Sequence, residues 1–219
     1  MNIDRYKTLI SNLPVRQQSF TTKRATWRKA EREIDWLENL NNKLFVDKDT
    51  LSISRQDIFD TVEIRELILK TIYWGYTGGM RGNHFISILM KIDLLETTLT
   101  FLKNKTNPSL VDFNELREIF KNIPGLGLST YSKILYFLQI KFNNNPCLIL
   151  DQRLIDVFAG KTYIEFHTLF SISYSNAEKK YLDFLQLAYK VSKDIQTEGE
   201  NIEQFLFIFG NNLKTNGNY

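Results

Sequence analysis

Apolar residues recur at a helical spacing along almost the whole chain, and few helix-breaking residues interrupt them. The 219 residues include 4 Pro and 10 Gly, fewer than a protein built from short strands and tight turns needs. The spacing predicts helices over 22–41, 54–71, 83–103, 112–121, 128–142, 151–158, 176–195 and 202–209. We therefore expect an all-α fold, with any strand limited to short pieces near residues 44–53 or 147–150.

Polar residues that cap helices stand at several of the expected helix starts. Ser54 and Asp57 have the spacing of a capping box, and Asp112, Asp151 and Asn176 precede or open apolar segments. Each is expected to accept hydrogen bonds from the first free N–H groups of its helix.

Size and composition favour one helical domain over residues 1–219. The chain of 25.8 kDa has 43% hydrophobic residues, enough to bury a core. A single cysteine, Cys147, excludes a disulfide framework and a Cys-based zinc site, and His84 and His167 lack metal-ligand spacing, so we expect no metal site. Apolar runs long enough for a membrane span or a signal peptide are absent from the sequence, which favours a cytoplasmic protein.

Positive charge gathers near the N-terminus although the formal net charge is only +3. The cations of this stretch are Arg16, Lys23, Arg24, Arg28, Lys29 and Arg32. Two interpretations stay open at this point, a helix that lies along a nucleic acid and an ordinary solvated helix face.

The most informative motif is a tight turn between two apolar helical segments, Ile123-Pro-Gly-Leu-Gly-Leu-Ser-Thr130. Two glycines after a proline permit positive φ and leave room for close approach. The turn and the start of the next helix then present free N–H groups together, an arrangement suited to a phosphate. The residues predicted to contact DNA here are Pro124, Gly125, Leu126, Gly127, Ser129 and Thr130. An ordinary turn between packed helices is the alternative interpretation.

Two chemically active side chains follow the turn. Lys133 lies one helical turn after Ser129, among apolar neighbours, where partial burial favours an unprotonated amine that can act as a nucleophile. Asp151 follows the apolar run Cys147–Leu150 at a helix start, where the helix dipole favours the carboxylate. A fixed carboxylate beside an amine is suited to stabilising positive charge on a sugar. The alternatives are a lysine that extends to solvent and an aspartate that only caps a helix.

Residues 123–137 and 147–158 resemble the helix-hairpin-helix DNA glycosylases, and in particular the bacterial branch with an 8-oxoguanine DNA glycosylase-like fold. Residues 73–76 and 202–207 look similar to the same branch. The resemblance implies a helical glycosylase-like globule whose hairpin and active-site element span 112–158. It implies removal of an oxidised purine such as 8-oxoguanine from DNA, with or without AP lyase activity through a lysine Schiff base.

The family's two catalytic residues carry over unequally. The aspartate matches Asp151. In many members the lysine follows the hairpin directly, a position that Ser129 holds here, whereas in this branch it lies further along the helix, at Lys133. We therefore assign Lys133 and Asp151 as catalytic residues. If the lysine assignment fails, the resemblance implies a monofunctional enzyme in which Asp151 acts with a water molecule.

Other residues are candidates for holding the substrate. A base that has left the DNA stack is held by aromatic stacking and edge hydrogen bonds, which Trp74, Tyr76, Arg81 and Phe85 could supply. Core packing is an equal alternative for the aromatic residues. Arg153 neighbours Asp151 and is a candidate for a phosphate contact.

The resemblance also sets the expected partners. We expect a monomer acting on double-stranded DNA with a damaged base, in a bacterial-type nucleoid. It needs no iron–sulfur cluster, because the cluster cysteines are absent, and no cofactor beyond, at most, a structural monovalent cation at the hairpin carbonyls. The alternatives are a non-enzymatic helix-hairpin-helix DNA-binding module and an interaction protein. Lys133 with Asp151 argues against the DNA-binding module, which needs neither residue. An interaction protein would show no salt-sensitive DNA binding.

Overall fold

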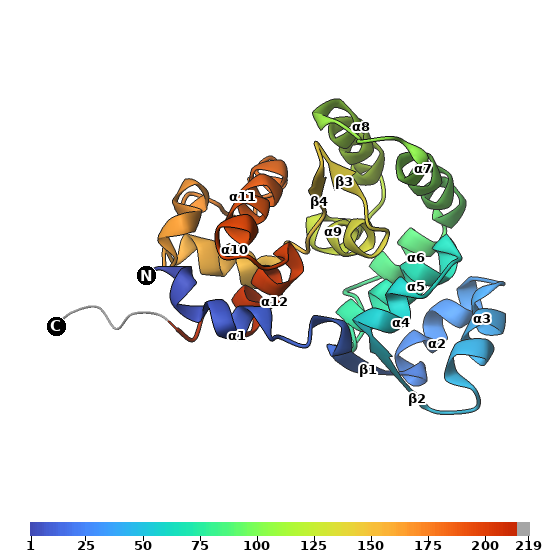
Figure 1. Ribbon diagram of the computed structural model, residues 1–219. Coiled ribbons are helices and arrows are strands. Elements are labelled where there is room, and N and C mark those ends of the chain that lie inside the picture. The colour runs from blue at the N-terminus through green and yellow to red at the C-terminus, as the bar shows by residue number, and fades with distance from the viewer. Residues whose placement is uncertain (214–219) are drawn as a thin grey trace.

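A computed structural model describes residues 1–213, and helices dominate it (Figure 1). The α-helices are α1 (Lys7–Ser11), α2 (Arg24–Glu33), α3 (Leu37–Phe45), α4 (Arg55–Phe59), α5 (Ile64–Gly75), α6 (His84–Leu89), α7 (Ile92–Asn104), α8 (Leu110–Lys121), α9 (Leu128–Phe137), α10 (Gln152–Ala159), α11 (Tyr181–Asp194) and α12 (Gly199–Phe209). Three 3-10 helices are η1 (Ile3–Tyr6), η2 (Val15–Gln17) and η3 (Ile164–Leu169). The predicted helical character is confirmed.

Two small antiparallel sheets show that all-α is too strict a description. β1 (Ser19–Lys23) pairs with β2 (Thr50–Ser54), which lies where a short strand was predicted, whereas β1 itself was not predicted. β3 (Lys141–Phe142) pairs with β4 (Asn145–Pro146). The two residues between β3 and β4 have positive φ, as in a type I′ hairpin. Residues 147–150 form no strand and are a buried linker.

Three of the predicted long helices are each two shorter helices. Residues 22–41 divide into the end of β1, α2 and the first part of α3, because Ile34 leaves the helical conformation. Residues 54–71 divide at the loop between α4 and α5, and residues 83–103 divide between α6 and α7. The apolar spacing continues through each break, since both halves face the same core, and so it does not reveal the breaks.

Other predicted boundaries move for identifiable reasons. The helix expected over 128–142 ends at Phe137, because Gln139 takes a positive φ and the chain then enters β3. Ser109 is the N-cap of α8, and Asp112 is its capping-box partner three residues later. Asn176 binds Ser171 and Ser173 in the preceding loop rather than capping a helix, and α11 starts only at Tyr181. Ser54 and Asp151 cap α4 and α10 as predicted.

Figure 1 shows the helices in two groups. One lobe contains α2 to α9 with both sheets, and the other contains η1, α1, α10, η3, α11 and α12. The N-terminus belongs to the second lobe, since the amino group of Met1 donates to Thr162 O at 2.6 Å and α1 packs against α12. The chain therefore passes between the lobes near residues 15–18 and again along the linker 147–151.

The turn between α8 and α9 is built around Gly125. The N–H of Leu126 donates to Ile123 O at 3.1 Å, with Pro124 and the positive-φ Gly125 (φ 87°) between them, the features of a type II turn. A Cβ at Gly125 would lie 2.3 Å from the Cβ of His84, the first residue of α6. Gly127 differs, because its φ is −79° and a Cβ there would meet nothing within 4 Å.

Gly125→Ala is therefore expected to destabilise the fold, and Gly127→Ala is its matched control. The first change places a side chain at a positive φ and against His84, and we expect it to lower the free energy of unfolding by about 2 kcal/mol or more. The second should cost less than about 1 kcal/mol. Urea unfolding of both variants measures the difference, and equal stabilities would contradict the packing of His84 on this turn.

Candidate active site

A cavity of about 210 Å³ lies where the two lobes meet. The first lobe contributes residues from β1, α4, α5 and α9, and the second contributes residues from the linker before α10 and from α12. The lining residues are Phe20, Arg55, Trp74, Gly75, Thr77, Lys133, Ile149, Asp151, Glu203 and Phe207. The two residues predicted to be catalytic thus line one cavity, although they come from different elements.

Lys133 is held inside the protein with its amine directed toward the start of α9. Lys133 is only 5% exposed. Nζ donates to Ser129 O at 2.7 Å and to Ser129 Oγ at 3.1 Å, and it lies 5.5 Å from the ring centroid of Tyr76. A Cβ at Gly75 would come within 3.0 Å of the lysine Cδ, so glycine leaves the space that the lysine stem occupies. The amine therefore reaches the level of Ser129 even though Lys133 lies one turn further on.

Asp151 combines a structural contact with a place in the cavity. Its Oδ1 accepts the N–H groups of Arg153 at 3.0 Å and Leu154 at 3.2 Å, which caps α10. Its Oδ2 makes no hydrogen bond within residues 1–213. The buried linker 147–150 fixes the position of this carboxylate, because all four of its residues belong to the core. One oxygen thus orients the carboxylate and the other is left for a ligand in the cavity.

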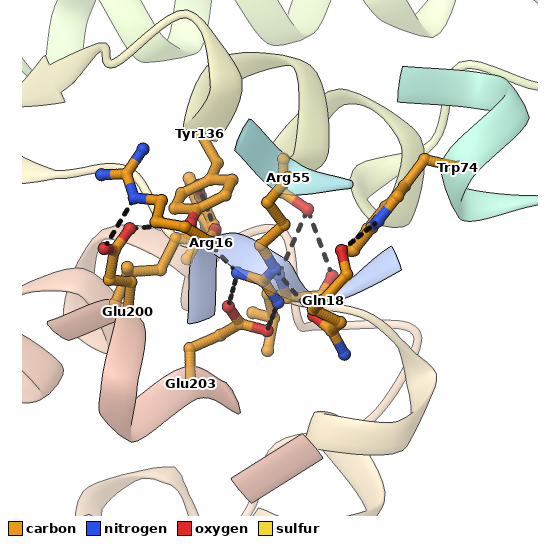
Figure 2. A network of polar contacts seen from close by, with 11 residues as sticks. Arg16, Gln18, Arg55, Trp74, Tyr136, Glu200 and Glu203 are labelled. Carbon is orange, nitrogen blue, oxygen red and sulfur yellow. Dashed lines mark hydrogen bonds and ion pairs between the residues drawn. The ribbon is translucent and has the colours of Figure 1, made fainter. Parts of the chain in front are cut away.

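The innermost wall of the cavity is a buried ion pair between the lobes, Arg55 of α4 with Glu203 of α12 (Figure 2). The two guanidinium NH groups meet the two carboxylate oxygens at 2.7 and 3.2 Å, and both side chains are 1% exposed. Arg55 also donates to Gln18 Oε1 at 2.7 Å and to Tyr136 OH at 3.1 Å. All three nitrogens of the guanidinium group are thereby bonded.

The surroundings of the pair act on its two charges in opposite directions. Burial disfavours the charge of Arg55, but Glu203 and Tyr136 outweigh burial and raise the pKa of the guanidinium group. Burial raises the pKa of the Glu203 carboxyl group, and the charge of Arg55 opposes that rise. The charge of Asp151 further raises the pKa of Glu203, and that of Lys133 lowers it. Two acidic and two basic side chains thus surround one small cavity.

Of the four residues predicted for a base pocket, only Trp74 lines the cavity. Its indole donates to Gln18 O at 3.2 Å and its ring packs edge-on against Phe20. Tyr76 lies next to the cavity, over the amine of Lys133, and its hydroxyl bonds Thr130 Oγ1 at 2.7 Å. Phe85 instead packs in the core against Trp27 and Tyr73, since its helix α6 turns it inward.

Arg81 is exposed in the loop before α6 and does not line the cavity. The structure thus brings Trp74 and Tyr76 to Lys133, and it does not bring Arg81 or Phe85 there.

The residues predicted to contact DNA divide into exposed and buried ones. Pro124 and Gly127 are exposed, Ser129 is half-buried, and the N–H groups of Gly127, Leu128 and Ser129 have no hydrogen-bond partner within residues 1–213. The side chains of Leu126 and Thr130 are buried, and Thr130 Oγ1 donates to Gly125 O at 3.2 Å. These two residues therefore hold the turn in shape, and their side chains do not face a partner.

Arg153 is exposed beside the N-terminus of α10, outside the cavity that contains Asp151. Its guanidinium group lies 4.8 Å from the ring centroid of Phe207, a residue that does line the cavity. Arg153 is thus accessible at the edge of the site.

Sequence reasoning missed the ion pair and two aromatic walls. Glu203 is a lone carboxylate inside the apolar stretch 202–209, which is a signal of a buried, paired charge. Its partner Arg55 lies in an ordinary helix start and carries no comparable signal. Phe20 and Phe207 come from opposite ends of the chain, and only the packing of the two lobes shows that they share the cavity.

Within residues 1–213, no three His, Cys, Asp or Glu side chains lie together in a way that could hold a metal ion. None of the helices in this part of the chain is long and apolar enough to cross a membrane.

Comparison with known families assigns the chain to a class of DNA repair proteins. Residues 13–207 match the family described as "Putative 8-oxoguanine DNA glycosylase OGG-like protein", and the chain belongs to this family. The match extends over both lobes and includes every residue that lines the cavity. Neither the curated proteins nor the solved structures yielded a match.

Glu203→Gln is expected to destabilise the protein strongly, because it leaves the buried charge of Arg55 without its counter-ion. Breaking one partner of a buried ion pair costs about 3–5 kcal/mol. Glu118→Gln is the matched control, since Glu118 pairs with Lys121 at 3.6 Å and both side chains are more than 70% exposed, at 72% and 74%, and we expect a change below about 1 kcal/mol. Thermal unfolding measures the stability of both variants. A Glu203→Gln protein as stable as the control would show that Arg55 does not need Glu203 as its counter-ion.

Proposed function

We propose that the protein is a DNA N-glycosylase that removes an oxidised purine such as 8-oxoguanine from duplex DNA and has AP lyase activity through Lys133. The observation that carries this proposal is the convergence of a buried lysine and a fixed aspartate in one cavity. The turn at Gly125 lies at the start of the helix that carries the lysine. A module that only grips DNA has no use for that cavity.

In the proposed reaction, the glycosidic bond breaks while the sugar develops positive charge. The base leaves with the bonding electron pair and takes up a proton. The free Oδ2 of Asp151 stabilises the cationic sugar and accepts the proton that the Lys133 nitrogen gives up. The nitrogen lone pair of Lys133 then forms a bond to the sugar C1′.

Opening of the sugar ring converts this adduct to a Schiff base between Lys133 and C1′. The Schiff base draws electrons from C2′, which loses a proton, and the 3′-phosphate leaves with its bonding pair. Water hydrolyses the Schiff base and returns the free amine. This sequence of steps needs no oxidant or metal ion, and we propose that the enzyme acts without a cofactor.

Contacts at Ser129 support Lys133 as the nucleophile. The carbonyl and hydroxyl oxygens of Ser129 hold Nζ at 2.7 and 3.1 Å, so the amine lies beside the residue at which many members of the family carry their lysine. If a water molecule attacks instead, Asp151 activates it and the enzyme releases the base without forming an adduct.

The aromatic walls support binding of a base inside the cavity. Trp74, Phe20 and Phe207 line it, and aromatic faces stack on a base that has left the duplex. Tyr76 is placed to contact the sugar or base beside Lys133. The cavity is thus suited to one flat, polar heterocycle.

Backbone donors at the turn support a phosphate contact next to the cavity. The free N–H groups of Gly127, Leu128 and Ser129 can bind a DNA phosphate without reading sequence. A structural monovalent cation at the turn carbonyls fits only in part, since the carbonyls of Ile123 and Gly125 each already accept one hydrogen bond. We further propose that the protein acts as a monomer on nucleoid DNA.

Lys133→Gln is expected to abolish the covalent adduct that borohydride traps between the protein and a duplex containing 8-oxoguanine. The amine is the atom that forms the bond, so its removal eliminates trapping and strand cleavage. Lys190→Gln, an exposed lysine of α11, is the control and should trap like the parent. Trapping by the Lys133→Gln protein would show that another nucleophile acts. Base release without trapping in the parent would support the water mechanism.

Asp151→Asn separates the two roles of this residue. Asparagine remains a good N-cap, so the stability of α10 should change little, while loss of the charge should slow base excision by about a hundredfold or more. Single-turnover excision measures the rate and thermal unfolding measures the stability. A variant that excises at the parental rate would remove the carboxylate from the mechanism and leave the capping role alone.

A further inference from the structure

The turn at Gly125 is in contact with a second surface that the cavity does not use. A Cβ at Gly125 would meet the Cα, Cβ and Cγ of His84 at 2.3–3.0 Å, so the two residues lie against each other. His84 follows Asn83, whose Oδ1 accepts a hydrogen bond from Lys29 Nζ of α2 at 2.7 Å. A continuous path therefore runs from the turn to α2 across the start of α6.

A second contact fixes α2 against the loop before α6. A Cβ at Gly79 would lie 3.1 Å from the methyl group of Thr26, so the glycine, which also has a positive φ of 93°, lets α2 approach this loop closely. α2 also packs against α6. The position of α2 relative to the turn is thus set by packing and does not depend on the exposed Lys29–Asn83 bond alone.

The exposed side of this path carries positive charge. We call it the basic strip and define it by Arg28, Lys29, Arg32 and Arg81, all of them exposed. None of the four pairs with an acidic side chain within residues 1–213. Arg24 does not belong to the strip, because it is largely buried and pairs with Glu31 at 3.0 Å.

Few acidic residues of α2 are available to neutralise the basic strip. Glu31 is already paired with Arg24 and Asn41. Glu33 and Asp35 are exposed near the end of α2, and neither forms an ion pair with the strip within residues 1–213. The strip cations of α2 are therefore unpaired, and one of them, Lys29, contacts the start of α6 next to the turn.

We propose that the basic strip binds the phosphate backbone of duplex DNA beyond the turn. This inference rests on the proposed function for the identity of the partner, and it adds a second contact region to that function. Cationic side chains without acidic partners can bind the phosphates of a polyanion without first breaking an ion pair, so the contact contributes favourably to the binding free energy. The turn binds through backbone N–H groups close to the cavity, and the strip then continues along the same partner with side-chain charges.

The test compares Arg28→Gln/Arg32→Gln with Lys190→Gln/Lys193→Gln, which removes the same charge from exposed positions on α11 of the other lobe. Binding to undamaged duplex DNA is measured by fluorescence anisotropy over a range of salt concentrations. Each lost phosphate contact should reduce the log–log salt slope by about 0.9 and the affinity at physiological salt by roughly fivefold. The α11 pair should leave the slope unchanged.

Duplex length provides a second readout. A short duplex covering only the turn should bind the parent and the strip variant alike, whereas a duplex extended by about one helical turn, ~10 base pairs, should bind the parent more tightly. A strip variant with the parental slope on the long duplex, or an equal loss from the α11 pair, overturns the basic strip and leaves the proposed function standing. A parental protein without salt-dependent DNA binding overturns both.

Discussion

The buried ion pair between Arg55 and Glu203 constrains how the two lobes pack against each other. The cost of burying its charges makes the pair a weak source of net stability, yet any arrangement that separates the two residues leaves an unpaired charge in the core. Tyr136 and Gln18 each accept a further hydrogen bond from the guanidinium group. Tyr136 donates in turn to Glu200, which forms an ion pair with Arg16 of η2. Figure 2 shows this network crossing between the lobes. The contacts therefore favour one alignment of α4 and α12, and with it one shape of the cavity.

The same alignment brings Lys133 and Asp151 together. Lys133 belongs to the first lobe through α9, whereas Asp151 starts α10 of the second, and only the short buried linker 147–150 separates β4 from that start. The aliphatic stem of Lys133 packs closely against Gly75, and its amine is directed toward Ser129. Preorganised charge of this kind is what stabilises a transition state. Backbone packing and the ion pair thus position the site, with little left to flexible side chains.

Sequence reasoning could predict the parts of the site that depend on local chemistry. Asp151 caps its helix as its position after an apolar run indicated, and Gly125 takes the positive φ that a Pro-Gly turn demands. The strand β1, the helix breaks and the inward position of Phe85 could not be predicted, because they depend on which distant elements meet. A buried aromatic at a helix start, such as Phe85, and a cavity aromatic, such as Trp74, have the same local pattern.

The structural role of Asp151 does not exclude the catalytic role that we propose for it. The N–H groups of Arg153 and Leu154 both bind Oδ1, so capping uses one of the two carboxylate oxygens. These two hydrogen bonds fix the orientation of the carboxylate at the start of α10. The cap therefore leaves the second oxygen of Asp151 for the chemistry that we propose, and a substitution that preserves the cap but not the charge tests the proposed role alone.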